Sequence, residues 1–320
     1  MQQLSTLFLS SGDLIADRRF DWAKDRESKG DLAGAADLLR QALELVPGYA
    51  SAWFSLGEIC EKCGDLPGAI AAFEQARAAD PDDRHGAALH LARLGAGNAD
   101  MPPAYVRALF DHYAPAFDRA LTEGLAYRGP ELLRAAVERV CAASGRPMRF
   151  GTALDLGCGT GLAGVAFRPQ VDWLVGVDLS AGMVAEARKK GLYDRLAALD
   201  LGAFLEGEAA AGFHLIVAAD VFVYFAELDA TLVAAARVLG PDGFFAFTTE
   251  THDGGGVILR ETLRYAHSEN HVRAALEKAG LTPLLLEPTS TRTEKQQPVP
   301  GLLVVAAPNA SPFAAKAKAL

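Results

Sequence analysis

The sequence predicts two kinds of folding unit in one chain: an all-helical repeat domain, then an α/β domain built on a mostly parallel sheet. Three observations predict it. A motif recurs every 34 residues between residues 16 and 81, and strand-like and helix-like segments alternate from residue 150 onward. A loop with glycine at every second position follows the first strand, at Gly157, Gly159 and Gly161. Alternation of this kind is typical of parallel strands joined by right-handed helical crossovers.

The composition is that of a chain with an ample core. The chain has 320 residues, enough for about two domains, and 50% of them are hydrophobic. The formal net charge of -9 disfavours a general nucleic-acid-binding surface. Four scattered cysteines indicate a reducing compartment. The apolar run Leu7 to Leu9 has no preceding Lys or Arg, and Asp220 interrupts the longest apolar run. We therefore expect a soluble, cytoplasmic chain without signal peptide or membrane span.

Residues 16–81 contain two copies of the repeat. Gly30-Asp31-Leu32 returns as Gly64-Asp65-Leu66, and the period of 34 residues is that of the tetratricopeptide repeat (TPR), a pair of packed helices. A third helix is expected from Asp83 to Leu94, and the TPR domain at residues 1–100. The second copy fits the family pattern best, at Trp53, Leu56, Gly57, Ala69, Phe73, Ala76 and Pro81.

Two repeats and a cap are fewer than a stack usually needs to be stable alone. Two interpretations of the TPR domain stay open. It offers a concave surface to a peptide or protein, or it is a platform that packs on the second domain or forms a homodimer. Cys60 and Cys63 have the spacing of half a redox or zinc site, but no second pair lies nearby. Because Cys60 falls at a core position of the repeat, we expect packing there, and no metal site.

A glycine- and proline-rich linker, Gly95 to Pro103, marks the domain boundary. The segment after it, residues 105–118, carries aromatic residues at helical spacing, which is typical of a buried stripe. A further helix is expected from Glu131 to Ala142, with a proline before its first turn. We assign residues 101–148 to a helical cover and linker.

The α/β domain is placed at residues 149–310, and an Ala- and Lys-rich flexible tail at residues 311–320. Ligands of such sheets lie beyond the carboxyl ends of the strands. The last two strands are joined by a turn region from Pro288 to Pro300. Seven strands are expected near residues 150–156, 172–178, 195–199, 213–219, 243–249, 282–287 and 301–307.

The glycine loop and the next strand suggest an adenosine site. Glycine tolerates positive φ and lets a ligand approach the backbone, and the free N–H groups of the loop favour a polar or anionic group. Asp178 ends the next strand, 21 residues after Gly157, where an acid can accept both hydroxyls of a ribose. A dinucleotide fingerprint would place its third glycine at position 162, which is a leucine. Here the third glycine comes earlier, at Gly161, and Asp155 precedes the loop.

This Asp-x-Gly-x-Gly-x-Gly pattern, residues 155–161, resembles motif I of the class I S-adenosylmethionine (SAM) methyltransferases, and the resemblance covers residues 105–308. It implies a Rossmann-like, seven-stranded domain with an antiparallel seventh strand, SAM as cofactor, and methyl transfer. The whole chain resembles bacterial proteins described as predicted methyltransferases containing TPR repeats. A tight turn that binds no ligand is the alternative.

The resemblance also implies which residues contact the cofactor. Asp178 would bind the ribose, Leu179 and Met183 would bracket the adenine, and Asp200 with Leu201 would contact its edge. The full set lies in the cover segment, the glycine loop and the ends of the next three strands: Tyr113, Asp155, Gly157, Cys158, Gly159, Gly161, Asp178, Leu179, Met183, Asp200, Leu201 and Asp220.

Several of these assignments have ordinary alternatives. The cover segment resembles the N-terminal helix that lies over SAM in small-molecule methyltransferases, which would bring Tyr113 to the methionine end; a packed aromatic stripe is the alternative. Helix packing is the alternative for Met183, and capping of the following helix is the alternative for Asp200. Asp220 ends a strongly apolar strand, so it needs either a partner such as a sulfonium or exposure to water.

Four polar residues are candidates for the acceptor pocket and are the catalytic candidates: Tyr224, His252, Tyr265 and His267. Methyl transfer mainly requires a lone-pair donor held in line with the methyl carbon. A base, either His252 or His267, is needed only if the acceptor carries a proton that must leave. A helix cap with surface contacts is the alternative for the Arg264-Tyr265-His267 cluster.

The acceptor stays open. The Asn/Asp-Pro-Pro-Tyr/Phe tetrad of base-amino methylation is absent, and residues 220–223 read Asp-Val-Phe-Val in its place. The first hypothesis is a methyltransferase acting on an O or N atom of a small molecule. The second is a protein or peptide methyltransferase whose TPR arm holds the substrate. The third is a TPR adaptor that binds SAM without turnover.

Overall fold

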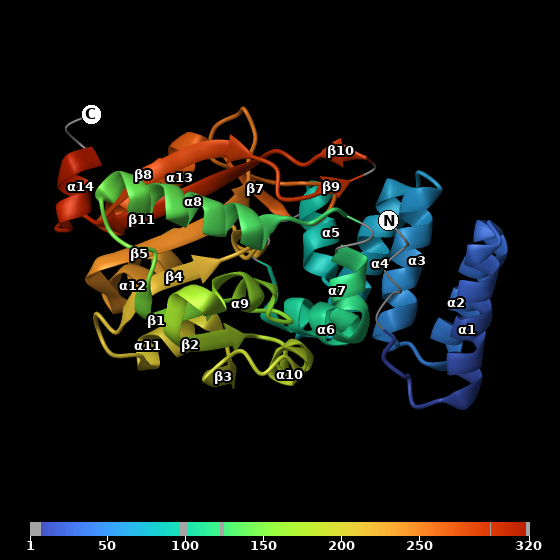
Figure 1. Cartoon of the computed structure of the whole chain (residues 1–320). Helices are drawn as coiled ribbons and strands as arrows, with labels where there is room; N and C mark the ends of the chain where they lie inside the picture. The colour runs from blue at the N-terminus through green and yellow to red at the C-terminus, as the bar shows by residue number, and fades with distance from the viewer. Residues whose placement is uncertain (1–7, 97–100, 122–124, 295, 318–320) are drawn as a thin grey trace. The chain divides into compact units, whose positions relative to one another are not determined.

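The chain forms two compact units, Gln2–Leu109 and Phe110–Leu320 (Figure 1). None of the helices in the described part of the chain combines the length and hydropathy that crossing a membrane requires. In that same part, no three or more His, Cys, Asp or Glu side chains are grouped so that they could hold a metal ion. The computed structural model describes residues 8–96, 101–121, 125–294 and 296–317.

The first unit is built from helical pairs. Asp31 and Asp65 occupy equivalent places in the two repeats, and each caps the following helix by accepting a hydrogen bond from a glycine N–H two residues into it. These matching caps confirm the predicted TPR period. The helices are α1 (Leu14–Ser28), α2 (Leu32–Leu45), α3 (Ala50–Lys62), α4 (Leu66–Ala79), α5 (Ala87–Arg93) and α6 (Pro103–Tyr113), which runs into the second unit.

Small residues set the packing of the second repeat. A methyl group on Gly57 would lie 2.6 Å from the Phe73 ring, so the glycine lets α3 and α4 approach closely. Cys60 packs in the same apolar core, and both Cys60 and Cys63 are free thiols. The third helix starts later than predicted because Asp83 turns the chain with a φ of 52° and accepts the N–H groups of Ala87 and Ala88.

The second unit contains the predicted sheet. Its strand order is β3-β2-β1-β4-β5-β11-β8, and β11 runs antiparallel to both of its neighbours. This confirms the class I methyltransferase fold with its reversed seventh strand. The strands are β1 (Phe150–Leu156), β2 (Val171–Asp178), β3 (Arg195–Ala198), β4 (Phe213–Ala218), β5 (Leu239–Glu250), β8 (Leu281–Thr289) and β11 (Gly301–Pro308).

Helices cover both faces of this sheet (Figure 1). Successive residues of a strand point to opposite faces. Leu154 therefore joins a core with residues of α11 (Leu201–Gly207), α12 (Asp229–Val238) and α13 (Glu269–Lys278). Ala153 joins a second core, on the other face, with residues of α8 (Gly129–Ser144) and α9 (Leu162–Phe167). The strands between them are buried on both sides, as the apolar runs of the sequence indicated.

Three elements of this unit were not foreseen. A hairpin of β6 (Val257–Leu259) and β7 (Tyr265–His267) follows β5, and a two-residue pair of strands, β9 (Thr293–Glu294) and β10 (Gln297–Pro298), lies between β8 and β11. Where a flexible tail was expected, the structure places α14 (Pro312–Ala317), whose Phe313 ring packs 5.5 Å from that of Phe244.

Candidate cofactor site

The glycine loop bridges the end of β1 and the end of β2. Gly157, Gly159 and Gly161 have φ values of 74°, 52° and 94°, a region that side chains disfavour. The N–H groups of Gly157 and Cys158 both donate to the carbonyl of Val177, each at 2.9 Å. The loop is therefore held against the end of β2, and the N–H of Gly161 closes it by donating to the carbonyl of Cys158 at 2.8 Å.

The three glycines differ in what surrounds them. A methyl group on Gly157 would lie 2.5 Å from a methyl of Val221, and one on Gly161 would lie 3.0 Å from the ring of Tyr193. On Gly159 it would meet none of the described atoms at a shorter distance than the Phe117 ring, at 4.0 Å. Packing within the protein thus explains two of the glycines. Gly159 leaves open space that a ligand can use.

Asp178 ties the loop to the next helix. Its Oδ2 accepts the N–H of Gly159 at 2.8 Å, and its Oδ1 accepts the N–H of Ser180 at 2.9 Å. Burial raises the pKa of the Asp178 carboxyl, and these backbone hydrogen bonds act in the opposite direction. Each oxygen keeps a second lone pair, so a ligand hydroxyl can still donate to it.

Asp155 is buried beneath the loop with one oxygen unused. Its Oδ2 accepts a 2.5 Å hydrogen bond from the hydroxyl of Tyr193. Its Oδ1 is buried and has no hydrogen-bond partner among the residues the structure describes. Burial raises the pKa of this carboxyl to about 7. An unpartnered buried oxygen of this kind is costly, and a ligand N–H group would satisfy it. Tyr193 was missed, because a lone tyrosine after a helix carries no motif.

The cover segment is fastened over this site at two points. Asp111 Oδ1, on α6, accepts from Ser180 Oγ at 2.5 Å and from the N–H of Gly182 at 2.9 Å. Further along, Asp118 accepts from the hydroxyl of Thr160 and from Lys190 Nζ, the latter at 2.7 Å. Lys190 Nζ also donates to the carbonyl of Thr160 at 2.7 Å. Asp118 lies on α7 (Phe117–Arg119) and Lys190 directly follows α10 (Ala181–Lys189).

Between these anchors, the hydroxyl of Tyr113 is buried and has no hydrogen-bond partner within the described ranges. Burial raises the pKa of its phenol. The resemblance of this segment pointed to the tyrosine but not to the two aspartates as anchors, although each directly follows a phenylalanine, Phe110 or Phe117. A second unsatisfied polar atom thus lies in the segment that covers the loop.

The remaining predicted cofactor residues have clear local roles. Met183 and Leu201 are buried, and the thiol of Cys158 is buried with its pKa raised. Asp200 is exposed and caps α11 by accepting the N–H of Ala203 at 3.1 Å. Leu179 is half-buried beside Asp178. For Met183 and Asp200 the structure therefore shows packing and capping.

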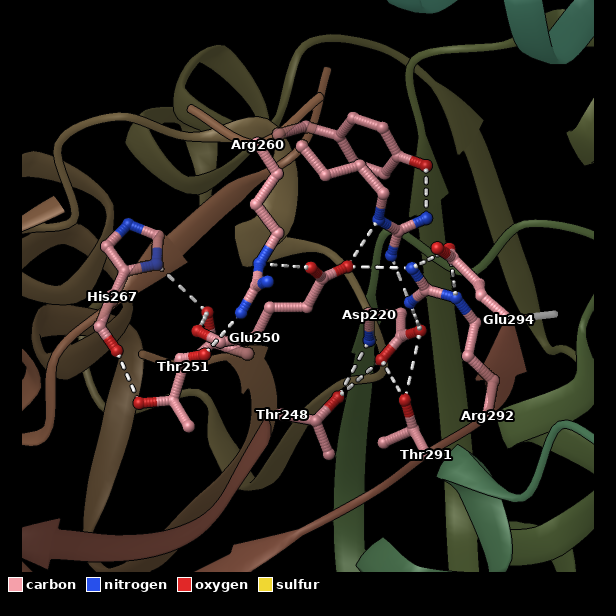
Figure 2. Close-up of polar contacts among 12 residues, drawn as sticks. Asp220, Thr248, Glu250, Thr251, Arg260, His267, Thr291, Arg292 and Glu294 are labelled. Carbon is pink, nitrogen blue, oxygen red and sulfur yellow. Dashed lines mark hydrogen bonds and ion pairs between the residues drawn. The ribbon is translucent and has the colours of Figure 1, made fainter. Parts of the chain in front are cut away.

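Asp220 lies in a polar cluster at the end of β4, and it is held there by protein groups (Figure 2). It adopts a φ of 56°, which is strained for a residue with a side chain. Thr248 and Thr291 each donate a hydroxyl hydrogen bond to its Oδ1 at 3.0 Å. Arg292 and Arg264 reach its Oδ2 at 3.2 Å and 3.5 Å. Partners that the sequence did not reveal thus account for the acid after an apolar strand.

Glu250, at the end of β5, joins three arginines in the same cluster. Figure 2 shows it facing Arg260, and its carboxylate pairs with Arg260 at 3.2 Å, Arg264 at 2.8 Å and Arg292 at 2.7 Å. Arg292, only 3% exposed, also pairs with Glu294 at 2.7 Å. The unforeseen β6–β7 hairpin region and the segment leading into β9 supply the arginines. Neither segment has a periodic pattern that sequence reasoning can detect.

The four catalytic candidates do not converge on one point. Tyr224 joins the cluster: Arg264 donates to its hydroxyl oxygen at 3.1 Å, and the Phe110 ring packs edge-on at 5.3 Å. His267 is fully buried, with Nδ1 3.0 Å from Thr249 Oγ1 and Nε2 2.9 Å from the carbonyl of Phe225.

Burial lowers the pKa of His267 to about 4, so the ring is neutral at pH 7. His252 bonds to its own loop through the N–H of Gly254 and the carbonyl of Gly256. Tyr265 is buried in β7. Tyr224 thus contacts both the cover segment and the arginine cluster.

Comparison with known proteins agrees with this geometry. Residues 20–84 match a tetratricopeptide repeat model, and residues 154–245 match a methyltransferase domain model. The chain is 31% identical over 175 residues to methyltransferase-like protein 27 of Homo sapiens, covering 54% of this chain and 66% of that protein. It is 31% identical over 133 residues to malonyl-[acyl-carrier protein] O-methyltransferase of Enterobacter lignolyticus, covering 42% of this chain and 52% of that protein.

The chain thus spans just under two thirds of one curated relative and about half of the other. Among solved structures, it is similar to 1,6-didemethyltoxoflavin-N1-methyltransferase of Burkholderia thailandensis. That likeness has a TM-score of 0.49 at 19% identity and covers 66% of this chain and 92% of the other.

Proposed function

We propose that this chain, which combines tetratricopeptide repeats with a methyltransferase domain, is an SAM-dependent methyltransferase acting on an O or N atom of a small-molecule acceptor. One observation carries the cofactor assignment. Asp178 fixes the glycine loop through Gly159 and the start of α10 through Ser180, while each of its oxygens keeps a free lone pair. This is the arrangement that a ribose diol requires at the ends of β1 and β2.

The other residues of the site fit the remaining parts of SAM. Gly159 leaves space for close approach to the backbone. The Oδ1 of Asp155, which has no partner among the described residues, suits the amino group of the methionine end. The Tyr113 hydroxyl, likewise without a partner in that part of the chain, lies in the segment that covers the loop. When bound, SAM supplies a methyl group already activated by a positive sulfur. The chain's own task is to orient an acceptor and to keep water away.

Two regions of the chain divide that task. The cover segment, fastened by Asp111 and Asp118, excludes water from the cofactor side. On the acceptor side, Arg264 fixes the hydroxyl of Tyr224, so that the tyrosine can position an acceptor atom. Both nitrogens of His267 and of His252 are engaged in hydrogen bonds. We therefore propose that the attacking atom of the acceptor has an available lone pair, so that no base of the protein has to deprotonate it.

The test is methyl transfer by the full chain from methyl-labelled SAM to a lysate of the source cells, separated afterwards into small-molecule and protein fractions. We expect label in the small-molecule fraction, and we expect Asp178→Ala to abolish it. Label in neither fraction, from a protein that binds S-adenosylhomocysteine (SAH), contradicts the proposal and favours a SAM-binding TPR adaptor without turnover.

One observation favours a protein or peptide acceptor as the second candidate. Helix α1 of the TPR unit exposes three large apolar side chains: Leu14 by 86%, Ile15 by 61% and Trp22 by 54%. Exposed apolar groups on one helix are typical of a contact surface. In the same assay, label in the protein fraction that is lost when all three residues are replaced by serine would support this alternative.

A further inference from the structure

Three glycines from three different elements make room for one aromatic ring. Methyl groups placed on Gly161 of the loop, Gly164 of α9 and Gly176 of β2 would lie 3.0 Å, 2.4 Å and 2.8 Å from atoms of Tyr193. Real Cβ atoms essentially never approach another atom as closely as at Gly164 and Gly176, and the contact at Gly161 would be unusually tight, so the ring fits because these positions carry no side chain. Tyr193, which precedes β3, is thus built into the base of the glycine loop.

The hydroxyl of this tyrosine is directed at Asp155. It donates to Oδ2 at 2.5 Å, while Oδ1 of the same carboxylate is buried and lacks a hydrogen-bond partner in the described part of the chain. The titratable groups that act on Asp155 are the phenol of Tyr193 and the carboxylate of Asp178, and Asp155 itself acts on the Cys158 thiol and the Tyr127 phenol. None of these is a cation. The Tyr193 hydroxyl and the backbone N–H of Gly164 both lower the pKa of this carboxyl. A cationic partner would stabilise the buried carboxylate further, and the ring fixes which of its oxygens is left for one.

We propose that Tyr193 is a positioning residue for cofactor binding: by holding Oδ2 of Asp155, it turns Oδ1 to receive the ammonium group of the methionine end of SAM. The inference rests on the proposed function. It assigns a role to a residue outside the glycine motif, and it explains why Gly164 and Gly176, which face no ligand in the sequence pattern, are glycines.

The proposal makes the pH dependence of binding informative. Asp155 must be ionised to hold an ammonium group, and burial raises the pKa of its carboxyl to about 7. SAH affinity should therefore fall as the pH drops below about 7, by up to about tenfold per pH unit. The hydrogen bond from Tyr193 lowers this pKa. Removing the hydroxyl must raise it, so the midpoint of the affinity change moves to higher pH.

The experiment is calorimetric titration of SAH into the full chain from about pH 6 to pH 8.5. Four proteins are compared: wild type, Tyr193→Phe, which keeps the ring, Asp155→Asn, and Tyr49→Phe, a matched control at a buried tyrosine of the TPR unit. We expect Tyr193→Phe to shift the midpoint upward by about one pH unit. Asp155→Asn should bind weakly at every pH. Tyr49→Phe should match the wild type, and the ligand's own titration is common to all four.

If Tyr193→Phe does not fold, 3-fluorotyrosine at position 193 replaces it; its more acidic hydroxyl should move the midpoint to lower pH. An unchanged midpoint, or affinity lowered equally at every pH, would overturn the inference, because a purely structural ring would behave so. Absence of SAH binding by the wild type at any pH would instead contradict the proposed function itself. The two failures are therefore distinguishable.

Discussion

Asp178 accepts a 2.8 Å hydrogen bond from the backbone N–H of Gly159, so the acid that ends β2 also sets the shape of the loop that follows β1. The same carboxylate accepts the N–H of Ser180 and thereby orients the start of α10. One side chain thus orders both the glycine loop and the start of α10.

Removing the amine that ties the cover segment should speed cofactor release. Lys190→Met deletes the 2.7 Å contacts to Asp118 and to the carbonyl of Thr160. Because the pair is partly exposed, we expect a loss of about 1 kcal/mol, or about a fivefold faster SAH dissociation. The matched control is Lys189→Met, which removes only a surface pair with Glu186. Stopped-flow fluorescence measures the rate; equal rates for the two variants would show that the lysine does not hold the cover.

Alanine at two glycines of the site should affect different properties: SAH binding at Gly159 and folding stability at Gly164. Gly159→Ala places a methyl group in open space, so we expect a small loss of thermal stability and at least about tenfold weaker SAH binding, because the methyl group occupies ligand space. Gly164→Ala places one 2.4 Å from the Tyr193 hydroxyl, and overpacking of this kind costs about 1–3 kcal/mol. Scanning calorimetry and SAH titration separate the two effects. Unchanged SAH affinity in Gly159→Ala would refute the ligand assignment of that space.

The arginine cluster should be sensitive to loss of its most buried member. Arg292→Met leaves Asp220 and Glu250 without a partner they share, and breaking a buried ion pair costs about 3–5 kcal/mol. Arg273→Met, which removes an exposed pair with Glu269, should cost less than about 0.5 kcal/mol. Calorimetric unfolding of both variants checks this. Equal melting temperatures would mean that the cluster contributes nothing to the fold.

His267 should make the fold weaker in mild acid. The pKa of this buried histidine is about 4 in the folded chain, below its ordinary value of 6.5. The unfolded chain therefore binds a proton that the folded chain does not, and stability falls as the pH drops from 6.5 toward 4, by about 3 kcal/mol in all.

The measurement is the difference in unfolding free energy between wild type and His267→Gln across that pH range. Asp155 contributes in the opposite direction, but equally in both proteins, so its contribution cancels in the difference. A difference that does not change with pH would contradict the burial of a neutral ring. Conversely, an acid limb of the turnover profile that disappears in His267→Gln without loss of stability would favour a catalytic base.

The sequence was most informative where a single pattern dictates structure. The 34-residue period predicted the helical pairs, and the apolar runs ending at Leu156, Asp178 and Ala218 predicted the strands that meet at the site. Both signals are local: a period or an apolar run needs no knowledge of distant partners. The acid after the glycine loop also follows from spacing along two consecutive strands.

Contacts between residues far apart in the sequence could not be predicted. Tyr193 and Asp155 lie 38 residues apart, and Asp220 and Arg292 lie 72 apart, so nothing nearby in the chain signals either contact. Each strand of the hairpin that contains Tyr265 and His267 is only three residues long, too short for an alternating pattern to be recognised. His267 was a candidate base because it lies in a polar cluster of the sequence with Arg264 and Tyr265. Only its burial between Thr249 and the Phe225 carbonyl reveals that both nitrogens are engaged.

Binding of SAH to the full chain tests the central claim most directly. Calorimetry would compare the wild type with Asp178→Ala and with Asp172→Ala, a control at the exposed start of the same strand, where the acid pairs with Arg149 on the surface. We expect clear binding by the wild type and the control, and at least about 100-fold weaker binding by Asp178→Ala, since two hydrogen bonds to a charged group are lost. Equal affinity in all three proteins, or no binding by a folded wild type, would contradict it.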